Sequence, residues 1–317
     1  MHRIISSLPL PTAGLALGLA ATGNLMSSYS GVLAGIFGVL STIIMALLIM
    51  KVIFAGRIVV EDLKNPAIAG IAATFPMGLM VLSAYICRLS YLAGYWLWAG
   101  GVLLQAVLIC YFTRRFIFNF NIKKVFPSYF VVYVGIAAAS ITAPLFGALT
   151  AGQLLFWCGF IAYLILLPLI GYRLYAIKPF PESLVPTITI FAAPPCLCLV
   201  GYLNSFPEKN MMLLLLLGIL SLISFSAVLL YLPVMLRLKF YPSYSAFTFP
   251  LVISAIAARG VENYLLVKGV VIPVLGYLST LAALLAIIFV VYVFVRYIAF
   301  IGKICIVDTT MPKAKGW

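Results

Sequence analysis

The stretch Ser243–Ala258, SYSAFTFPLVISAIAA, is apolar enough for the interior of a membrane, yet it carries a proline, Pro250, near its centre. A proline inside a helix removes one backbone hydrogen bond and displaces the carbonyl four residues earlier. In lipid such a break is tolerated where neighbouring side chains satisfy the freed group or where the break faces a water-filled cavity. The stretch therefore predicts a broken transmembrane helix beside a cavity.

The rest of the chain has the composition of a membrane protein. Its 317 residues are 65% hydrophobic and 8% charged, whereas soluble domains are about 45–50% apolar and about 25% charged. A helix needs about 20 mostly apolar residues to span a bilayer. Residues 1–303 are therefore expected to form one transmembrane channel domain, followed by a polar cytoplasmic tail over residues 304–317.

Ten apolar runs indicate ten spans in an all-α integral membrane fold. The runs are Leu10–Met26, Gly31–Ala55, Ala67–Cys87, Tyr91–Phe112, Tyr129–Phe146, Leu154–Tyr172, Leu184–Leu203, Met211–Met235, Ser243–Ala258 and Val270–Val295. The first run also resembles a signal peptide. Its interruptions by proline and glycine favour a retained span.

Basic residues divide unevenly between the two ends of these runs. All but four of the 20 Lys and Arg residues lie near the chain termini or in the connectors that follow even-numbered runs. The exceptions are Arg88, Lys209, Arg259 and Lys268. Positive residues favour the cytoplasmic side, so both termini are expected there, in a multi-pass protein of the inner or plasma membrane. This topology also explains the net charge of +14 without a nucleic-acid partner.

The connectors indicate a repeated hairpin. Most links on the outer side are short, such as 27–30 and 147–153, whereas the basic inner connectors are longer. The predicted unit is a helical hairpin repeated five times, an arrangement typical of channels and transporters. Five odd-numbered inner helices are expected to line a pore and five even-numbered helices to surround them.

Prolines interrupt the odd-numbered runs in particular. The first run carries Gly14 and Gly18 in their place, and prolines of the even runs lie nearer the ends. Five broken helices can surround a cavity into which their freed backbone groups face. The predicted kink residues are Pro76, Pro144, Pro194, Pro195 and Pro250.

Two of these prolines lie in the same short sequence, Thr74-Phe75-Pro76 and Thr248-Phe249-Pro250. The carbonyls that the prolines free belong to Ala72 and Ala246. Each threonine hydroxyl can bond nearby backbone or face the lumen. Each phenylalanine can project across a pore or serve only in packing.

Neutral hydroxyls supply the polar groups of the predicted lumen, although each of them can instead bond its own helix backbone. Hydroxyls are weak anion donors and so favour passage over capture. The candidates on odd-numbered runs are Thr12, Thr22, Ser83, Ser140, Thr142, Thr187, Thr189, Ser245, Thr248 and Ser254.

Ionisable residues are confined to the ends and connectors. All six acidic residues lie there, and the one histidine is His2. Proton-coupled carriers keep titratable residues inside the membrane, so the pattern favours a passive channel or uniporter. Because the spans hold no cluster of His, Asp, Glu and Cys, no enzyme, cofactor or metal site is predicted. The six cysteines are interpreted as small buried hydrophobes.

Several short motifs resemble one known family. They are Pro9-Leu10-Pro11-Thr12 leading into Gly18-Leu19-Ala20, Pro127-Ser128-Tyr129-Phe130, Ala193-Pro194, and Ala246-Phe247-Thr248-Phe249-Pro250. In these motifs the chain resembles the tellurite-resistance and C4-dicarboxylate transporter family, which includes plant guard-cell slow anion channels and the bacterial tellurite-resistance membrane protein. It differs in lacking long cytoplasmic termini and in a less aromatic Tyr244-Ser245-Ala246.

The resemblance implies a homotrimer of independent pores, each occluded by a phenylalanine on the ninth helix. Its motif places this gate on Phe249. The resulting hypothesis is a channel for small anions such as chloride or nitrate, in contact with membrane lipid. The alternative is a carrier or efflux protein for C4-dicarboxylates, sulfite or tellurite. The expected pore-lining residues are Phe75, Thr74, Thr248, Ser245, Ser140, Thr142, Thr187 and Phe191.

Overall fold

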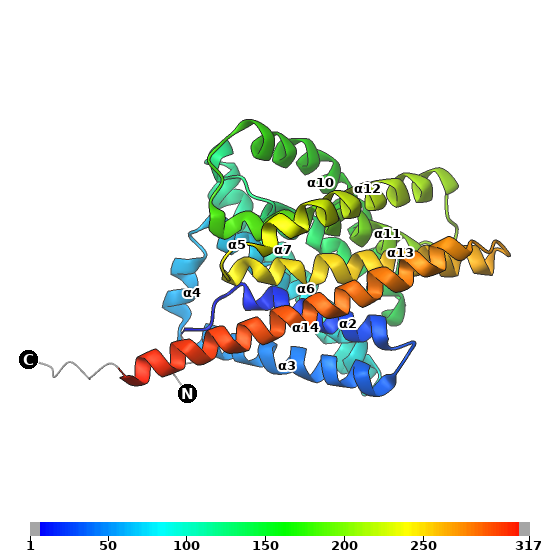
Figure 1. Ribbon diagram of the computed structural model, residues 1–317. Coiled ribbons are helices and arrows are strands. Elements are labelled where there is room, and N and C mark those ends of the chain that lie inside the picture. Colours follow the sequence, from blue (N-terminus) through cyan, green and yellow to red (C-terminus); the bar gives the residue numbers. More distant parts are fainter. Residues whose placement is uncertain (1–6, 311–317) are drawn as a thin grey trace, which may run out of the picture.

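The computed structural model describes residues 7–310, and this part of the chain is a bundle of helices without β-strands (Figure 1). Within residues 7–310, nine segments are long and apolar enough to cross a membrane. They are Gly31–Phe54, Pro66–Cys87, Tyr91–Ile117, Ser128–Phe146, Leu149–Ala176, Glu182–Ser205, Met211–Leu236, Pro242–Val267 and Pro273–Lys303. A shorter apolar helix, Thr12–Met26, precedes them.

Five outer helices run almost without interruption. They are α3 (Gly31–Phe54), α7 (Tyr91–Phe112), α10 (Leu149–Ala176), α12 (Met211–Leu236) and α14 (Pro273–Thr310). Only 22–33% of the residues in their most apolar stretches are buried. In Figure 1, α3 lies along the bottom and α10 along the top of the bundle, with α6 and α13 between them. Such apolar exposed faces suit contact with lipid.

The inner segments are buried and, apart from the first, broken. They comprise α2 (Thr12–Met26); α5 (Pro66–Ala72) with α6 (Thr74–Cys87); α8 (Ser128–Tyr133), η3 (Val134–Ala137), α9 (Ala138–Thr142) and η4 (Ala143–Phe146); η5 (Glu182–Ala192) with α11 (Ala193–Ser205); and η6 (Pro242–Phe247) with α13 (Phe249–Val267). Four of them have 67–78% of their apolar stretch buried, and α2 has 13 of its 15 residues buried.

The inner segments form a closed ring. Helix α2 packs against α6, α6 against α9, α9 against α11, α11 against α13, and α13 against α2. Consecutive helices also pack together, as in α2 with α3, α6 with α7, and α13 with α14. The all-helical prediction and the distinction between inner and outer segments agree with this arrangement. The ten-span count and the side on which the termini lie stay predictions.

Most predicted kink prolines begin a new helix. Pro194 and Pro195 lie in the first turn of α11, Pro250 is the second residue of α13, and Pro76 is the third residue of α6. A proline costs little there, because the first amides of a helix have no intrahelical acceptor. The inner segment Ser128–Phe146 differs from the expectation. Its change to 3-10 geometry falls at η3, whereas Pro144 lies in the final turn, η4.

The connectors and termini also depart from the expected boundaries. A short helix that the sequence did not predict, α4 (Gly56–Asp62), follows α3. A π-helical turn, η1 (Thr113–Ile117), extends α7, and a 3-10 turn, η2 (Ile122–Lys124), lies in the connector after it. Helix α14 continues to Thr310 and so includes the first residues of the predicted tail. Residues 311–317, with Lys313 and Lys315, and the N-terminal Arg3 and His2 lie outside the described residues.

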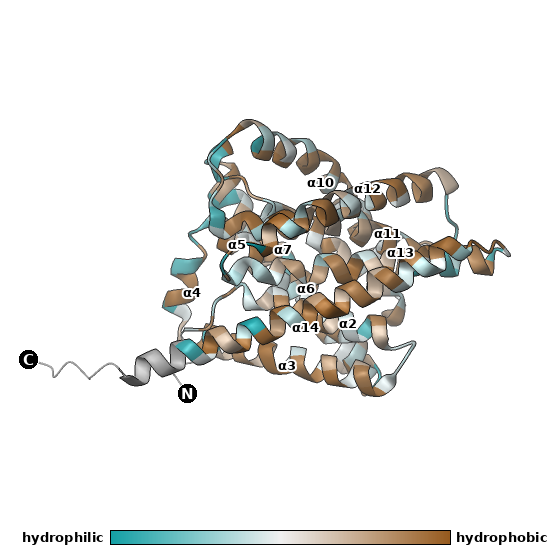
Figure 2. Ribbon diagram, viewed as in Figure 1, coloured by the Kyte–Doolittle hydropathy of each residue, from teal (hydrophilic) through white to brown (hydrophobic). Residues whose placement is uncertain are grey.

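Side-chain placement separates the ends of the bundle from its sides. Figure 2 shows hydrophobic residues along the helices and hydrophilic residues gathered near α4 and its neighbouring connectors. The Nζ of buried Lys51 donates to the Leu8 carbonyl at 2.6 Å and lies 3.4 Å from Asp62. The interpretation of all cysteines as buried was wrong for Cys110 and Cys158, which are exposed on outer helices.

Glycines allow α2 to approach the break before α13. Helix α2 is continuous, so Gly14 and Gly18 do not kink it as the sequence suggested. A Cβ atom at Gly18 would lie 2.4 Å from the Thr248 hydroxyl oxygen, and one at Gly14 would lie 3.1 Å from the Ser245 side chain. Gly14 and Gly18 therefore allow close packing between α2 and the inner segment formed by η6 and α13.

We expect Gly18→Ala to lower the thermal stability of the purified protein. The added methyl group meets Thr248 within a packed interior, and overpacking of this kind costs about 1–3 kcal/mol. Gly35→Ala is the matched control, because a Cβ there meets nothing within 4 Å. Equal melting temperatures for the two variants would contradict this role of Gly18.

Candidate functional site

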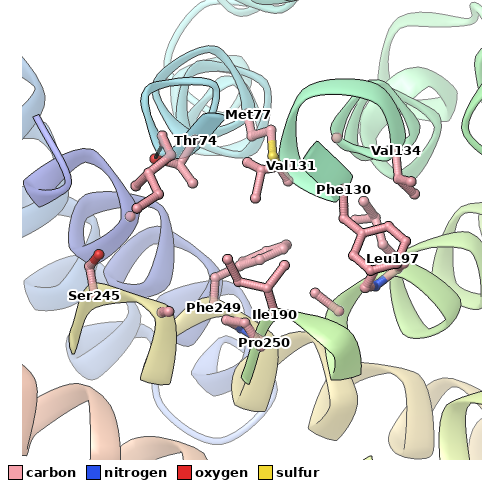
Figure 3. Close-up of a pocket in the computed structure, with 16 residues that line it drawn as sticks. Thr74, Met77, Phe130, Val131, Val134, Ile190, Leu197, Ser245, Phe249 and Pro250 are labelled. Atoms are coloured by element: carbon pink, nitrogen blue, oxygen red, sulfur yellow. Dashed lines mark hydrogen bonds between the residues drawn. The ribbon is translucent and has the colours of Figure 1, made fainter. Parts of the chain in front are cut away.

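A small cavity lies at the centre of the inner ring (Figure 3). Its volume is about 40 Å³, which is room for about three water molecules. All five inner segments contribute to its wall. The lining residues are Gly14, Ile71, Thr74, Met77, Phe130, Val131, Val134, Gly135, Ile190, Ala193, Pro194, Leu197, Ser245, Ala246, Phe249 and Pro250.

Phe249 projects into this cavity from the break between η6 and α13. It is the first residue of α13, and its side chain is drawn beside Ile190 and Pro250 in Figure 3. The preceding residue, Thr248, has φ −87° and ψ −83°, which lies outside the helical region. The chain therefore turns at Thr248 and directs Phe249 inward. Phe249 is 5% exposed, so the space around it is narrow.

The two Thr-Phe-Pro copies occupy different registers. Thr74 is the first residue of α6 and lines the cavity, whereas Phe75 is half-buried and does not line it. In the other copy Phe249 is the first helical residue and lines the cavity, and Thr248 does not. The shared tripeptide thus brings a different side chain to the lumen in each segment.

Most predicted lumen hydroxyls bond backbone. Ser140 donates to Ala137 O at 2.6 Å, Thr142 to Met80 O at 3.3 Å, and Thr187 to Leu184 O at 2.5 Å. The same holds for Thr12, Thr22, Ser83, Thr248 and Ser254. Of the expected pore-lining hydroxyls, only Thr74 and Ser245 line the cavity, and Thr74 also donates to Ile71 O at 2.7 Å.

Phe130 is a lining residue that the sequence reading did not select. It lies on α8 and is buried, and its ring meets that of Phe191 edge-on at 5.2 Å. Phe191, which was selected, does not line the cavity. The signal for Phe130 was its place in the Pro127-Ser128-Tyr129-Phe130 motif. Aromatic side chains from two inner segments, Phe130 and Phe249, therefore line the same space.

The wall of the cavity is neutral and almost entirely apolar. None of its 16 lining residues is ionisable, and among residues 7–310 no three His, Cys, Asp or Glu side chains group as metal ligands. Hydrophobic constrictions of this kind gate pores by excluding water. The arrangement suits an occluded passage and supplies no catalytic group.

Side chains of outer helices donate hydrogen bonds to carbonyls of the broken inner segments. The buried Gln105 amide on α7 donates to Val131 O at 3.1 Å and Val132 O at 2.7 Å, where α8 passes into η3. Nearby, the Trp98 indole donates to Ala139 O at 3.2 Å. Backbone groups without partners are costly in lipid, so these side chains stabilise the break beside Phe130 and Val131.

Charged groups lie near the C-terminal ends of two inner helices, α11 and α13. Arg259 lies 3.2 Å from Glu262, which also accepts a hydrogen bond from Ser279 at 2.6 Å. This pair is partly buried between α13 and α14. Burial lowers the pKa of Lys209, and the charge of Lys268 lowers it further.

The fold and the cavity together define a class: a multi-pass membrane protein with the features of a channel or transporter. A family model described as SLAC1, voltage-dependent anion channel, matches residues 5–298. The chain belongs to this family, which includes tellurite-resistance and C4-dicarboxylate transporters, and the resemblance stated from its motifs is confirmed. No individual curated protein matches the chain.

We expect Gln105→Leu to lower the melting temperature. The change removes the side-chain donor of two buried carbonyls, and a hydrogen bond of this kind contributes about 0.5–1.5 kcal/mol to stability. Gln153→Leu is the matched control: its amide also donates to a carbonyl, Ser205 O at 3.1 Å, but Gln153 is only half-buried. A thermal shift as large at Gln153 would refute the special role of Gln105.

Proposed function

We propose that the protein is a channel for small monovalent anions, such as chloride or nitrate, and that Phe249 is its gate. The observation that carries the proposal is the position of Phe249, which projects from a helix break into a narrow central cavity surrounded by all five inner segments. Membership of the anion channel family supports the choice of anions as the transported ions.

The proposed assembly follows the sequence expectations. Ten helices cross the cell membrane as five hairpins, with both termini in the cytoplasm and the five buried segments around the pore. Three copies form a homotrimer in which each protomer has its own pore. The burial difference between inner and outer segments supports this arrangement, because the inner ring closes within one chain and needs no second copy.

Selectivity for monovalent anions follows from the lining. The cavity offers no acidic side chain that would attract cations and no basic side chain that would hold an anion tightly, and conduction requires weak sites. A neutral, narrow passage makes an ion lose part of its hydration shell. Dehydration costs far more for a doubly charged ion, so dicarboxylates and sulfate are disfavoured.

We expect Phe249→Ala to increase the anion current in planar bilayer recordings of reconstituted protein. Removing the ring enlarges the cavity that Phe249 lines, and a barrier lower by ~1.4 kcal/mol corresponds to a roughly tenfold higher rate.

Phe75→Ala is the matched control for the gate. Phe75 also precedes a proline at a helix start, but it does not line the cavity. We expect the anion current of Phe75→Ala to stay near that of the unmodified protein. An unchanged current in well-folded Phe249→Ala, or the same increase in both variants, would refute the gate.

We expect the relative permeability of Phe249→Ala to follow ease of dehydration, with nitrate above chloride and both well above sulfate and succinate. Reversal potentials under bi-ionic conditions measure this order. A saturable succinate or sulfite flux without unitary currents would instead support a carrier on the same fold.

A further inference from the structure

The hydroxyl of Thr248 lies at the break before Phe249 and reaches two segments of the inner ring. It lies 2.7 Å from Ser245 O, across the break between η6 and α13, and 3.1 Å from Gly14 O on α2. A threonine hydroxyl has one hydrogen, so the two carbonyls share it. Thr22, by comparison, bonds only Gly18 O within its own helix.

Three consecutive side chains at the break point in three directions. Phe247 is fully buried and packs against Tyr244 at 4.9 Å and against Phe289 of α14 at 6.1 Å. Thr248 faces α2, and Phe249 faces the cavity. The direction of Phe249 is therefore tied to the contacts that the two preceding residues make with α14 and α2.

The surface of α2 is shaped to receive Thr248. Gly18 leaves the space that the threonine side chain fills, because a Cβ at Gly18 would lie 2.4 Å from the hydroxyl oxygen and 2.5 Å from the threonine Cβ. Thr248 is fully buried, so water does not compete for its hydrogen. Loss of a buried hydrogen bond is then felt in full.

We propose that Thr248 is a positioning residue for the gate: its hydroxyl joins the break between η6 and α13 to α2 and so holds Phe249 in the occluding orientation. This inference rests on the proposed function, since it assigns no role to Thr248 apart from Phe249. The Thr248 backbone, at φ −87° and ψ −83°, is outside the helical region, so this residue sets the direction in which the chain enters α13.

The test is a double-mutant cycle on current per inserted protein in planar bilayers with chloride. Thr248→Val keeps the size of the side chain and removes the hydrogen bond, so we expect a roughly two- to tenfold higher current, the range that a bond of this kind supports. Thr248→Ser keeps the hydroxyl and should retain the original current. Thr248→Val combined with Phe249→Ala should conduct no more than Phe249→Ala alone.

The control is Thr22→Val, which removes one equally buried hydroxyl whose hydrogen bond, to Gly18 O, stays within α2. We expect it to leave the current unchanged. If Thr248→Val reduces the yield of folded protein, Thr248→Ala removes the same hydroxyl without the second methyl group beside Gly18 and is held to the same expectation.

The outcomes separate this inference from the proposed function. If Phe249→Ala raises the current while Thr248→Val and Thr248→Ala do not, the gate stands and the role of Thr248 is wrong. Additive effects of the two changes, or an equal effect of Thr22→Val, also overturn it. If Phe249→Ala leaves the current unchanged, the proposed function fails and the role of Thr248 with it.

Discussion

The need to satisfy backbone carbonyls inside the membrane is the constraint on which the rest of this structure depends. Lipid cannot solvate backbone carbonyls, and buried side chains donate to carbonyls at or beside two of the breaks in the inner segments. Gln105 serves Val131 O and Val132 O, and Thr248 serves Ser245 O and Gly14 O. These donors come from neighbouring helices or from the break itself, so the cavity keeps an apolar wall although four of the five segments around it are broken.

The same constraint explains why hydroxyls do not make the lumen polar. In water a serine or threonine is free to face solvent, but in a buried helix its nearest acceptor is a carbonyl three or four residues earlier. Ser140 and Thr187 donate to such carbonyls. What remains at the centre is a set of apolar and aromatic side chains in which Phe249 and Phe130 are the largest. Occlusion by such groups excludes water without any charge that could trap an ion.

Much of the fold could be predicted from the sequence because hydropathy reports directly on burial in lipid. The family, the all-helical fold and the placement of Phe249 at a break followed from apolar runs, prolines and short motifs. Register within the breaks did not. The identical Thr-Phe-Pro tripeptides present Thr74 in one segment and Phe249 in the other, because their helices begin at different residues of the motif. Phe130 was missed for a related reason: the break beside it contains Gly135 and no proline.

Prolines and glycines in this ring have separate roles, and the distinction bears on how a gate can move. Prolines such as Pro195 and Pro250 begin helices, where the missing amide has no consequence, so they fix where a segment turns. Gly14 and Gly18 leave α2 continuous and open its surface to η6 and to the break before α13. A turn fixed by proline and held laterally by one shared hydrogen bond can change its orientation without unfolding a helix. If Phe249 is the gate, a displacement of α2 relative to α13 would act on its side chain through Thr248.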